Sequence, residues 1–199
     1  MARPHRLETA DVLMALAIGV AVAGLAMLLR TPWHSWGDDF AGYLLQARAM
    51  AADDVRAEVL LNGSLVMASD SLPVPAAYSW GFPTLLWMGS RLGGWDLMPL
   101  KMIGGLSLGV AAAYTFALSR SFLSRSPSVL AAALVGLQPT LLQSSDLLLS
   151  DLPFLALAAA TLYYMDRSYR AAADGATARG GPLLAAVLTV AAYTVRANG

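Results

Sequence analysis

Two adjacent carboxylates follow the first long apolar run of the sequence, in the stretch Trp36-Gly37-Asp38-Asp39. A carboxylate held where water meets a low-dielectric membrane is suited to accept a proton or to bind a cation. An Asp pair can equally cap a following helix through the free N–H groups of its first turn. The residues alone leave both interpretations open, and Asp38 and Asp39 are the candidate catalytic residues.

A second acidic stretch, from Ser145-Asp146 to Ser150-Asp151-Leu152-Pro153, precedes a later apolar run. Asp151 suits a helix cap, because Pro153 would fall in the first turn of that helix. The functional alternative places Asp151 in one site with the Asp38 and Asp39 pair. Asp39 and Asp151 would then be candidate metal ligands, and Mg or Mn fits them best because both metals favour oxygen ligands.

Three basic or imidazole side chains lie near the same predicted helix ends. Arg196 follows the last apolar run, where it can bind a phosphate or extend to the membrane interface. Lys101 lies inside the second run, and we expect it to extend outward without a functional role. His34 has no second histidine nearby, which argues against a tetrahedral zinc site.

The composition indicates an integral membrane protein. Of 199 residues, 57% are hydrophobic and 13% are charged, whereas soluble domains carry about 25% charged residues. The formal net charge is zero, which gives no basic surface for nucleic acid. Cysteine is absent, so disulfides and thiolate metal sites are excluded.

The sequence predicts an all-α fold, a polytopic bundle of transmembrane helices. A helix needs about 20 apolar residues to cross a bilayer, and shorter spans are accommodated by tilt or local thinning. The first run is longer than the apolar core of a cleavable signal peptide. The predicted spans are residues 11–29, 97–118, 128–142, 152–165 and 182–195.

Arginine placement predicts the orientation. The cytoplasmic side of a membrane protein is enriched in basic residues. Such residues precede the first span and follow the second and fourth, at positions Arg3, Arg6, Arg120, Arg125, Arg167, Arg170 and Arg179. The N-terminus is therefore predicted inside and residues 31–96 form an acidic external loop. Within it, residues 40–52 and 78–92 predict interfacial helices and Asn62-Gly63 predicts a turn.

Three short motifs together resemble a known family. They are Trp36-Gly37-Asp38-Asp39, Tyr78-Ser79-Trp80-Gly81-Phe82-Pro83 and Ser150-Asp151-Leu152-Pro153-Phe154. With the first span before them, they resemble the GT-C superfamily of membrane glycosyltransferases. The likeness is to bacterial enzymes similar to dolichyl-phosphate-mannose protein mannosyltransferase and lipid A aminoarabinose transferase.

The resemblance implies a multi-pass enzyme of the bacterial cytoplasmic membrane and cell envelope. It would transfer a sugar, with inversion, from a polyprenyl-phosphate donor to a glycan, lipid or protein acceptor on the outer face. Asp38 or Asp39 would accept the acceptor's proton. Asp151, Arg196 and Tyr78 would bind substrate or phosphate, with Mg or Mn as an optional cofactor. Residues 1–199 are then expected to be the N-terminal part of a larger, C-terminally truncated module.

A non-enzymatic multispan protein, such as a transporter or an envelope assembly subunit, is the alternative. Its external loops would be connectors and its acidic residues helix caps. Transporters tend to place ionisable residues near the bilayer midplane. Here the acidic residues cluster at predicted outer helix ends, which favours the enzyme.

Overall fold

The computed structural model describes residues 7–34, 39–68, 75–175 and 180–196. Within these ranges all regular structure is helical, which confirms the all-α prediction. The helices are α1 (Thr9–Leu28), α2 (Phe40–Ala51), α3 (Val55–Met67), α4 (Gly81–Gly93), α5 (Leu97–Ser119), α6 (Arg125–Gly136), α7 (Pro139–Ser145), α8 (Asp151–Ala173) and α9 (Gly181–Val195).

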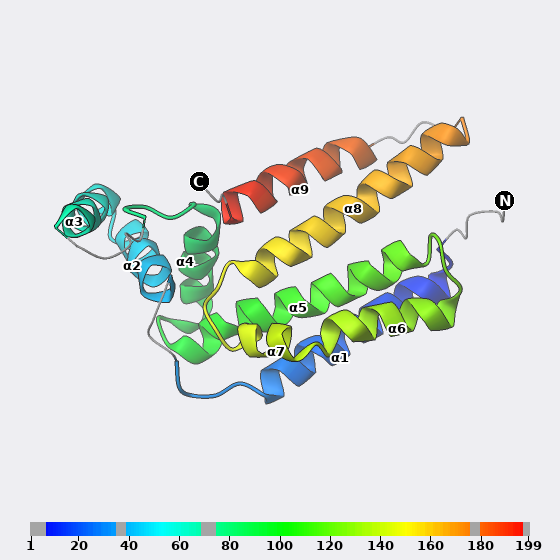
Figure 1. The fold of residues 1–199 in the computed structure, drawn as a ribbon, viewed down its shortest axis with the longest axis horizontal. Coiled ribbons are helices and arrows are strands. Elements are labelled where there is room, and N and C mark those ends of the chain that lie inside the picture. Colours follow the sequence, from blue (N-terminus) through cyan, green and yellow to red (C-terminus); the bar gives the residue numbers. More distant parts are fainter. Residues whose placement is uncertain (1–6, 35–38, 69–74, 176–179, 197–199) are drawn as a thin grey trace.

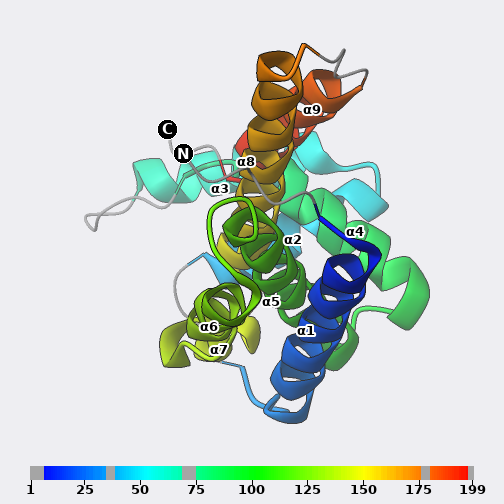
Figure 2. The same ribbon diagram turned by 90° about the vertical axis from the view of Figure 1, so that its right-hand side faces the viewer.

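The long helix α5 lies at the centre, in contact with α1, α6 and α8, and α9 packs against α8 (Figures 1 and 2). The short helices α2, α3 and α4 gather at one end of these long helices (Figure 1). That end also holds the last turn of α1, the first turns of α5 and α8, and the last turn of α9. We call it the loop end, and the opposite end the turn end.

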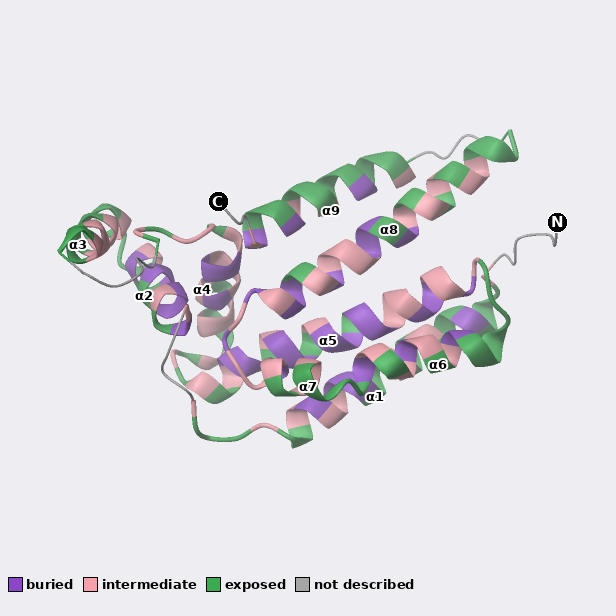
Figure 3. Ribbon diagram, in the orientation of Figure 1, coloured by how far each residue is buried: buried purple, intermediate pink, exposed green. Residues whose placement is uncertain are grey.

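Two helices are long and apolar enough to cross a membrane, namely α1 and α5, and α9 is a shorter apolar helix. Large apolar side chains of the outer helices are exposed, and Val20, Leu28 and Leu183 are 73%, 85% and 70% exposed. Exposed residues run along most of α9 (Figure 3). Apolar surface of this extent is unusual on a monomeric soluble protein. These findings support membrane association.

Two predicted spans differ in the structure. Residues 152–165 belong to the 23-residue helix α8, which continues to Ala173. Residues 128–142 are divided between α6 and α7, with Leu137 and Gln138 between them. The residue before a proline is biased away from helical backbone, and Gln138, which precedes Pro139, is extended at φ −65° and ψ 122°.

An apolar core joins α1 to α5 and α8. Val22, Ala26, Leu108, Ala112 and Leu152 are buried together.

At the turn end, a buried carboxylate adds a charged contact. Asp11 in α1 accepts hydrogen bonds from Arg120 at 3.1 Å and Arg125 at 3.0 Å. Both arginines follow the second predicted span, so one carboxylate ties the start of α1 to the connection between α5 and α6.

The segment from residue 31 to 96 contains three helices in its described part. Helices α2 and α4 lie within or close to the two predicted interfacial segments. The predicted turn at Asn62-Gly63 is wrong, because α3 runs through both residues. The Asn62 amide donates to the Glu58 carboxylate at 3.2 Å. This contact between residues four apart lies along the helix surface and replaces the turn-forming bonds that asparagine usually makes.

Candidate functional site

The predicted site residues that the structure describes all come from the loop end. Asp39 immediately precedes α2, Tyr78 precedes α4, Asp151 is the first residue of α8, and Arg196 follows α9. Asp38 lies outside the described residues. Four segments distant in sequence therefore contribute side chains to one end of the protein.

The Asp39 carboxylate contacts Tyr78. The Tyr78 hydroxyl donates a hydrogen bond of 2.9 Å to Asp39 Oδ1. Asp39 occupies the capping position of α2, yet its side chain makes no capping hydrogen bond. The carboxylate is thus aimed at another segment of the loop, and the structural interpretation of Asp39 as a side-chain cap is wrong.

A chain of contacts leads from Tyr78 to the second acidic stretch. The ring of Tyr78 lies 4.5 Å from that of Tyr43, centroid to centroid. The Tyr43 hydroxyl is 3.0 Å from the Ser150 hydroxyl in a buried hydrogen bond. Ser150 directly precedes Asp151. The structure therefore connects Asp39 to the start of α8 through side chains of α2 and the segment before α4.

Asp151 forms an ion pair with Arg196, joining α8 to the end of α9. The two side chains are 41% and 37% exposed, so both ions remain open to solvent or to a ligand. Ser150, not Asp151, occupies the cap position of α8. The cap interpretation of Asp151 is therefore wrong as well, because its carboxylate pairs with Arg196, the residue that follows α9.

Glycine at position 81 sets where the end of α9 lies. A Cβ atom at Gly81 would be 2.6 Å from the Val195 nitrogen, which is closer than real Cβ atoms come to a neighbour. Only glycine lets α4 meet the backbone of Thr194 and Val195 at this distance. The next residue is Arg196, so the packing of α4 on α9 fixes the origin of the arginine side chain.

An apolar pocket of about 590 Å³ lies between α4, α5, α8 and α9. Its lining includes Pro153 and Val195, which are close in sequence to Asp151 and Arg196 respectively. Other lining residues are Leu85, Leu106, Val110, Ala156, Leu157 and Ala191. The pocket thus combines an apolar wall with a nearby exposed cation. Such a combination suits an amphiphile with an apolar chain and an anionic head.

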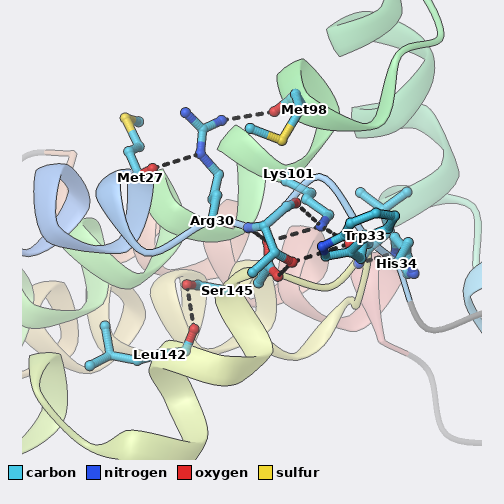
Figure 4. Close-up of polar contacts among 11 residues, drawn as sticks. Met27, Arg30, Trp33, His34, Met98, Lys101, Leu142 and Ser145 are labelled. Carbon is cyan, nitrogen blue, oxygen red and sulfur yellow. Dashed lines mark hydrogen bonds and ion pairs between the residues drawn. The ribbon is translucent and has the colours of Figure 1, made fainter.

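The prediction that Lys101 extends outward is wrong. Its side chain is fully buried, and its ammonium group donates to the carbonyl oxygens of Thr31 at 2.8 Å and Trp33 at 2.5 Å and to Asp146 Oδ1 at 2.9 Å (Figure 4). An ammonium group has three donors, so all three are used. A buried charge requires such partners, and the segment after α1 supplies two of them by folding over Lys101.

Asp146 completes this cluster. It also accepts from the Thr31 amide at 3.0 Å and from the Thr31 hydroxyl at 2.5 Å. Burial alone raises the pKa of Asp146, but the hydrogen bonds from Thr31 and Lys101 outweigh it and leave the pKa below its usual value. Asp146 therefore stays ionised and ties the segment before Asp39 to the segment before Asp151.

Three further hydrogen bonds hold the segment after α1. The Arg30 guanidinium donates to the carbonyl oxygens of Met27 at 3.1 Å and Met98 at 2.8 Å (Figure 4). His34 Nε2 accepts from the Leu148 amide at 3.3 Å. The sequence did contain a signal for the cluster around Lys101. A single lysine inside an apolar run carries a charge that needs a polar partner at the same level of the helix bundle.

The predicted metal ligands are engaged otherwise. Among the residues that the structure describes, no three His, Cys, Asp or Glu side chains gather as a metal site. Asp39 accepts from Tyr78 and Asp151 pairs with Arg196. Metal binding by these carboxylates therefore stays a prediction, and we derive no chemical step through a metal. The exposed cation of the site is Arg196.

The fold and the site define a helical protein whose loop end carries two linked acidic positions, an arginine and an apolar pocket. Comparison of the sequence with known protein families and with curated proteins, and of the structure with solved structures, gave no match.

Proposed function

We propose that this protein is a multi-pass membrane glycosyltransferase that transfers a sugar from a polyprenyl-phosphate donor to an acceptor on the outer face, inverting the anomeric centre. The apolar pocket beside the Asp151–Arg196 ion pair carries this proposal. A polyprenyl-phosphate sugar joins a long apolar chain to a phosphate anion. The pocket suits the chain and Arg196 suits the phosphate, since guanidinium groups bind phosphate oxygens in pairs.

The reaction assigns a role to each side chain. The acceptor hydroxyl attacks the sugar C1 atom from the side opposite the phosphate and forms the new C1–O bond. The acceptor's proton passes to the Asp39 carboxylate. The old C1–O bond breaks and leaves its electron pair on the phosphate oxygen, where Arg196 stabilises the growing charge. Asp151 orients Arg196 before the donor binds.

Orientation in the membrane follows from the two ends of the protein. The site residues lie at the loop end, and Arg120, Arg125, Arg167 and Arg170 lie toward the turn end. Since basic residues favour the cytoplasmic side, the loop end is assigned to the outer face. Polyprenyl-phosphate sugars reach such a site through the bilayer, and no soluble nucleotide sugar is needed.

Donor binding is tested with a polyprenyl phosphate and the polyprenol of the same chain length, which lacks the phosphate. Arg196→Gln should weaken phosphate binding by roughly 10- to 100-fold, because hydrogen bonds to a charged group contribute about 1.5–3 kcal/mol. Polyprenol binding should be unchanged. Ala191→Phe, which fills the pocket, should weaken both ligands. Equal affinities in wild type and both variants would contradict the proposed donor site.

Catalysis is tested by transfer of labelled sugar from polyprenyl-phosphate donors in membranes. Asp39→Asn should abolish transfer at normal protein level. Arg56→Ala is the matched control, because Arg56 lies exposed on α3 and should not affect transfer. Absence of transfer by the wild type from every donor would instead favour the transporter or assembly subunit.

A further inference from the structure

Asp39, at the cap of helix α2, and three residues of the helix itself form a row along one face. Residues 39, 42, 43 and 46 are three, four and seven positions apart, a spacing that brings side chains to the same side of a helix. Each of them meets another segment: Asp39, Gly42, Tyr43 and Gln46 all contact or approach Tyr78. We call this row, with Tyr78 lying over it, the tyrosine cradle.

Gln46 is the least expected member of the cradle. It is 2% exposed, although glutamine is usually a surface residue. Its amide nitrogen donates to the Tyr78 carbonyl oxygen at 3.0 Å, and its amide oxygen accepts from the Tyr78 N–H at 2.8 Å. One buried side chain therefore satisfies both backbone groups of Tyr78, as a neighbouring strand would.

Gly42 supplies independent support. A Cβ atom at this position would overlap the Tyr78 ring. The ring consequently rests directly on the backbone of α2, a place that only glycine leaves open. The same ring also meets the ring of Tyr43, with 4.5 Å between centroids. Backbone and ring of Tyr78 are thus each held by a residue of α2, and the hydroxyl is left pointing at Asp39.

We propose that Gln46 is a positioning residue, which holds Tyr78 so that its hydroxyl fixes the Asp39 carboxylate for proton transfer. The inference rests on the proposed function. The hydrogen bond from Tyr78 occupies Asp39 Oδ1, which assigns the proton-accepting role to Oδ2. A carboxylate held in one orientation avoids the loss of rate that a displaced base brings, about 100-fold for a displacement near 1 Å.

The orientation of Tyr78 is measured with 3-fluorotyrosine incorporated at position 78 of the full chain, using the fluorine NMR shift in detergent. Asp39→Asn gives the reference shift for an altered hydrogen bond. Gln46→Met, which keeps the length of the side chain but neither backbone bond, should move the signal away from that of the wild type. Gly42→Ala should move it too, because the added Cβ would overlap the Tyr78 ring. Gln143→Met, on an exposed glutamine of α7, is the matched control.

The catalytic consequence is measured by steady-state transfer. Gln46→Met should lower kcat by about 10- to 100-fold and leave KM for the donor within about twofold, because the pocket and Arg196 are untouched. An unmoved fluorine signal in both Gln46→Met and Gly42→Ala would overturn the inference whatever the activity. A moved signal with unchanged kcat would also overturn it. Absence of transfer by the wild type overturns the proposed function, and the fluorine signal then still decides whether Gln46 holds Tyr78.

Discussion

The ammonium group of Lys101 lies 2.9 Å from Asp146 Oδ1, and the lysine side chain is fully buried. The same nitrogen binds the carbonyl oxygens of Thr31 and Trp33. One helix, α5, thereby fixes both the segment that leads to Asp39 and the segment that leads to Asp151. The relative placement of the two acidic positions depends on this contact.

Lys101 is the only lysine of the sequence, so its burial can be tested chemically. We expect an amine-reactive reagent to leave Lys101 unmodified in the folded protein and to modify it after unfolding. Digestion and mass spectrometry identify the modified site. Rapid modification of Lys101 in the folded protein would contradict the buried cluster.

Lys101→Met should destabilise the protein strongly. Removing Lys101 leaves the Asp146 carboxylate without its cation and with only the hydrogen bonds from Thr31. For buried pairs such a loss costs up to about 3–5 kcal/mol. Thermal unfolding in detergent, followed by the loss of folded monomer, checks this expectation. Arg56→Met, on the exposed face of α3, is the control. A Lys101→Met protein as stable as that control would refute the prediction.

Asp146 should make the stability of the folded protein depend on pH in the acidic range. Its pKa in the folded protein is below the usual value, so ionised Asp146 stabilises the fold above about pH 4. This contribution is lost as the pH falls through the folded pKa. The unfolding midpoint of the wild type should exceed that of Asp146→Asn at pH 7, and the gap should narrow as the pH falls below about 4. A gap that stays constant would show that ionisation of Asp146 does not matter.

Gly81→Ala should separate α4 from the end of α9. The added Cβ would lie 2.6 Å from the Val195 nitrogen, and overpacking of this kind costs about 1–3 kcal/mol. Because Arg196 follows Val195, affinity for a polyprenyl phosphate should fall together with the unfolding midpoint. Gly24→Ala is the matched control, since a Cβ at Gly24 meets no atom within 4 Å. That variant should be unchanged or slightly more stable, because alanine favours the helix.

Asp11→Asn should separate stability from activity. Asp11 is fully buried at the turn end and pairs with Arg120 and Arg125. Its neutralisation removes the buried anion from both arginines, and Arg125 keeps only its more exposed pair with Glu8 at 3.7 Å. We expect a lower unfolding midpoint, and at temperatures where the variant stays folded we expect wild-type donor affinity. A selective loss of donor binding would contradict the assignment of the site to the loop end.

Much of the helical framework could be predicted from the sequence, because long apolar runs are strong signals. Residues 11–29 and 97–118 correspond closely to α1 and α5. The break at Gln138-Pro139 and the helix through Asn62-Gly63 were missed, since each depends on a local choice that patterns describe only weakly. In α3 the contact from Asn62 to Glu58 favoured the helix over the turn.

The places of the candidate site residues in the fold were predicted in part. Asp39, Tyr78, Asp151 and Arg196 come from one end of the fold, as expected from their places beside the apolar runs. Their partners could not be predicted, because contacts such as Asp151 with Arg196 join residues 45 apart in the chain. The importance of Lys101 was also missed. Its partners include two backbone carbonyl oxygens. Every residue type carries a carbonyl group, so the residue types in the sequence do not indicate which residues are the partners.

The tyrosine cradle occupies only two turns of α2, and this makes α2 a segment that tolerates substitution better than insertion. One inserted residue between positions 39 and 46 would rotate everything after it by about 100°, so Gln46 would turn away while Asp39 stayed in place. Such an insertion would leave the fold intact but would destroy the alignment of Asp39 and Gln46 on one face of α2. In evolution and in engineering alike, the length of this helix is therefore constrained more tightly than its sequence.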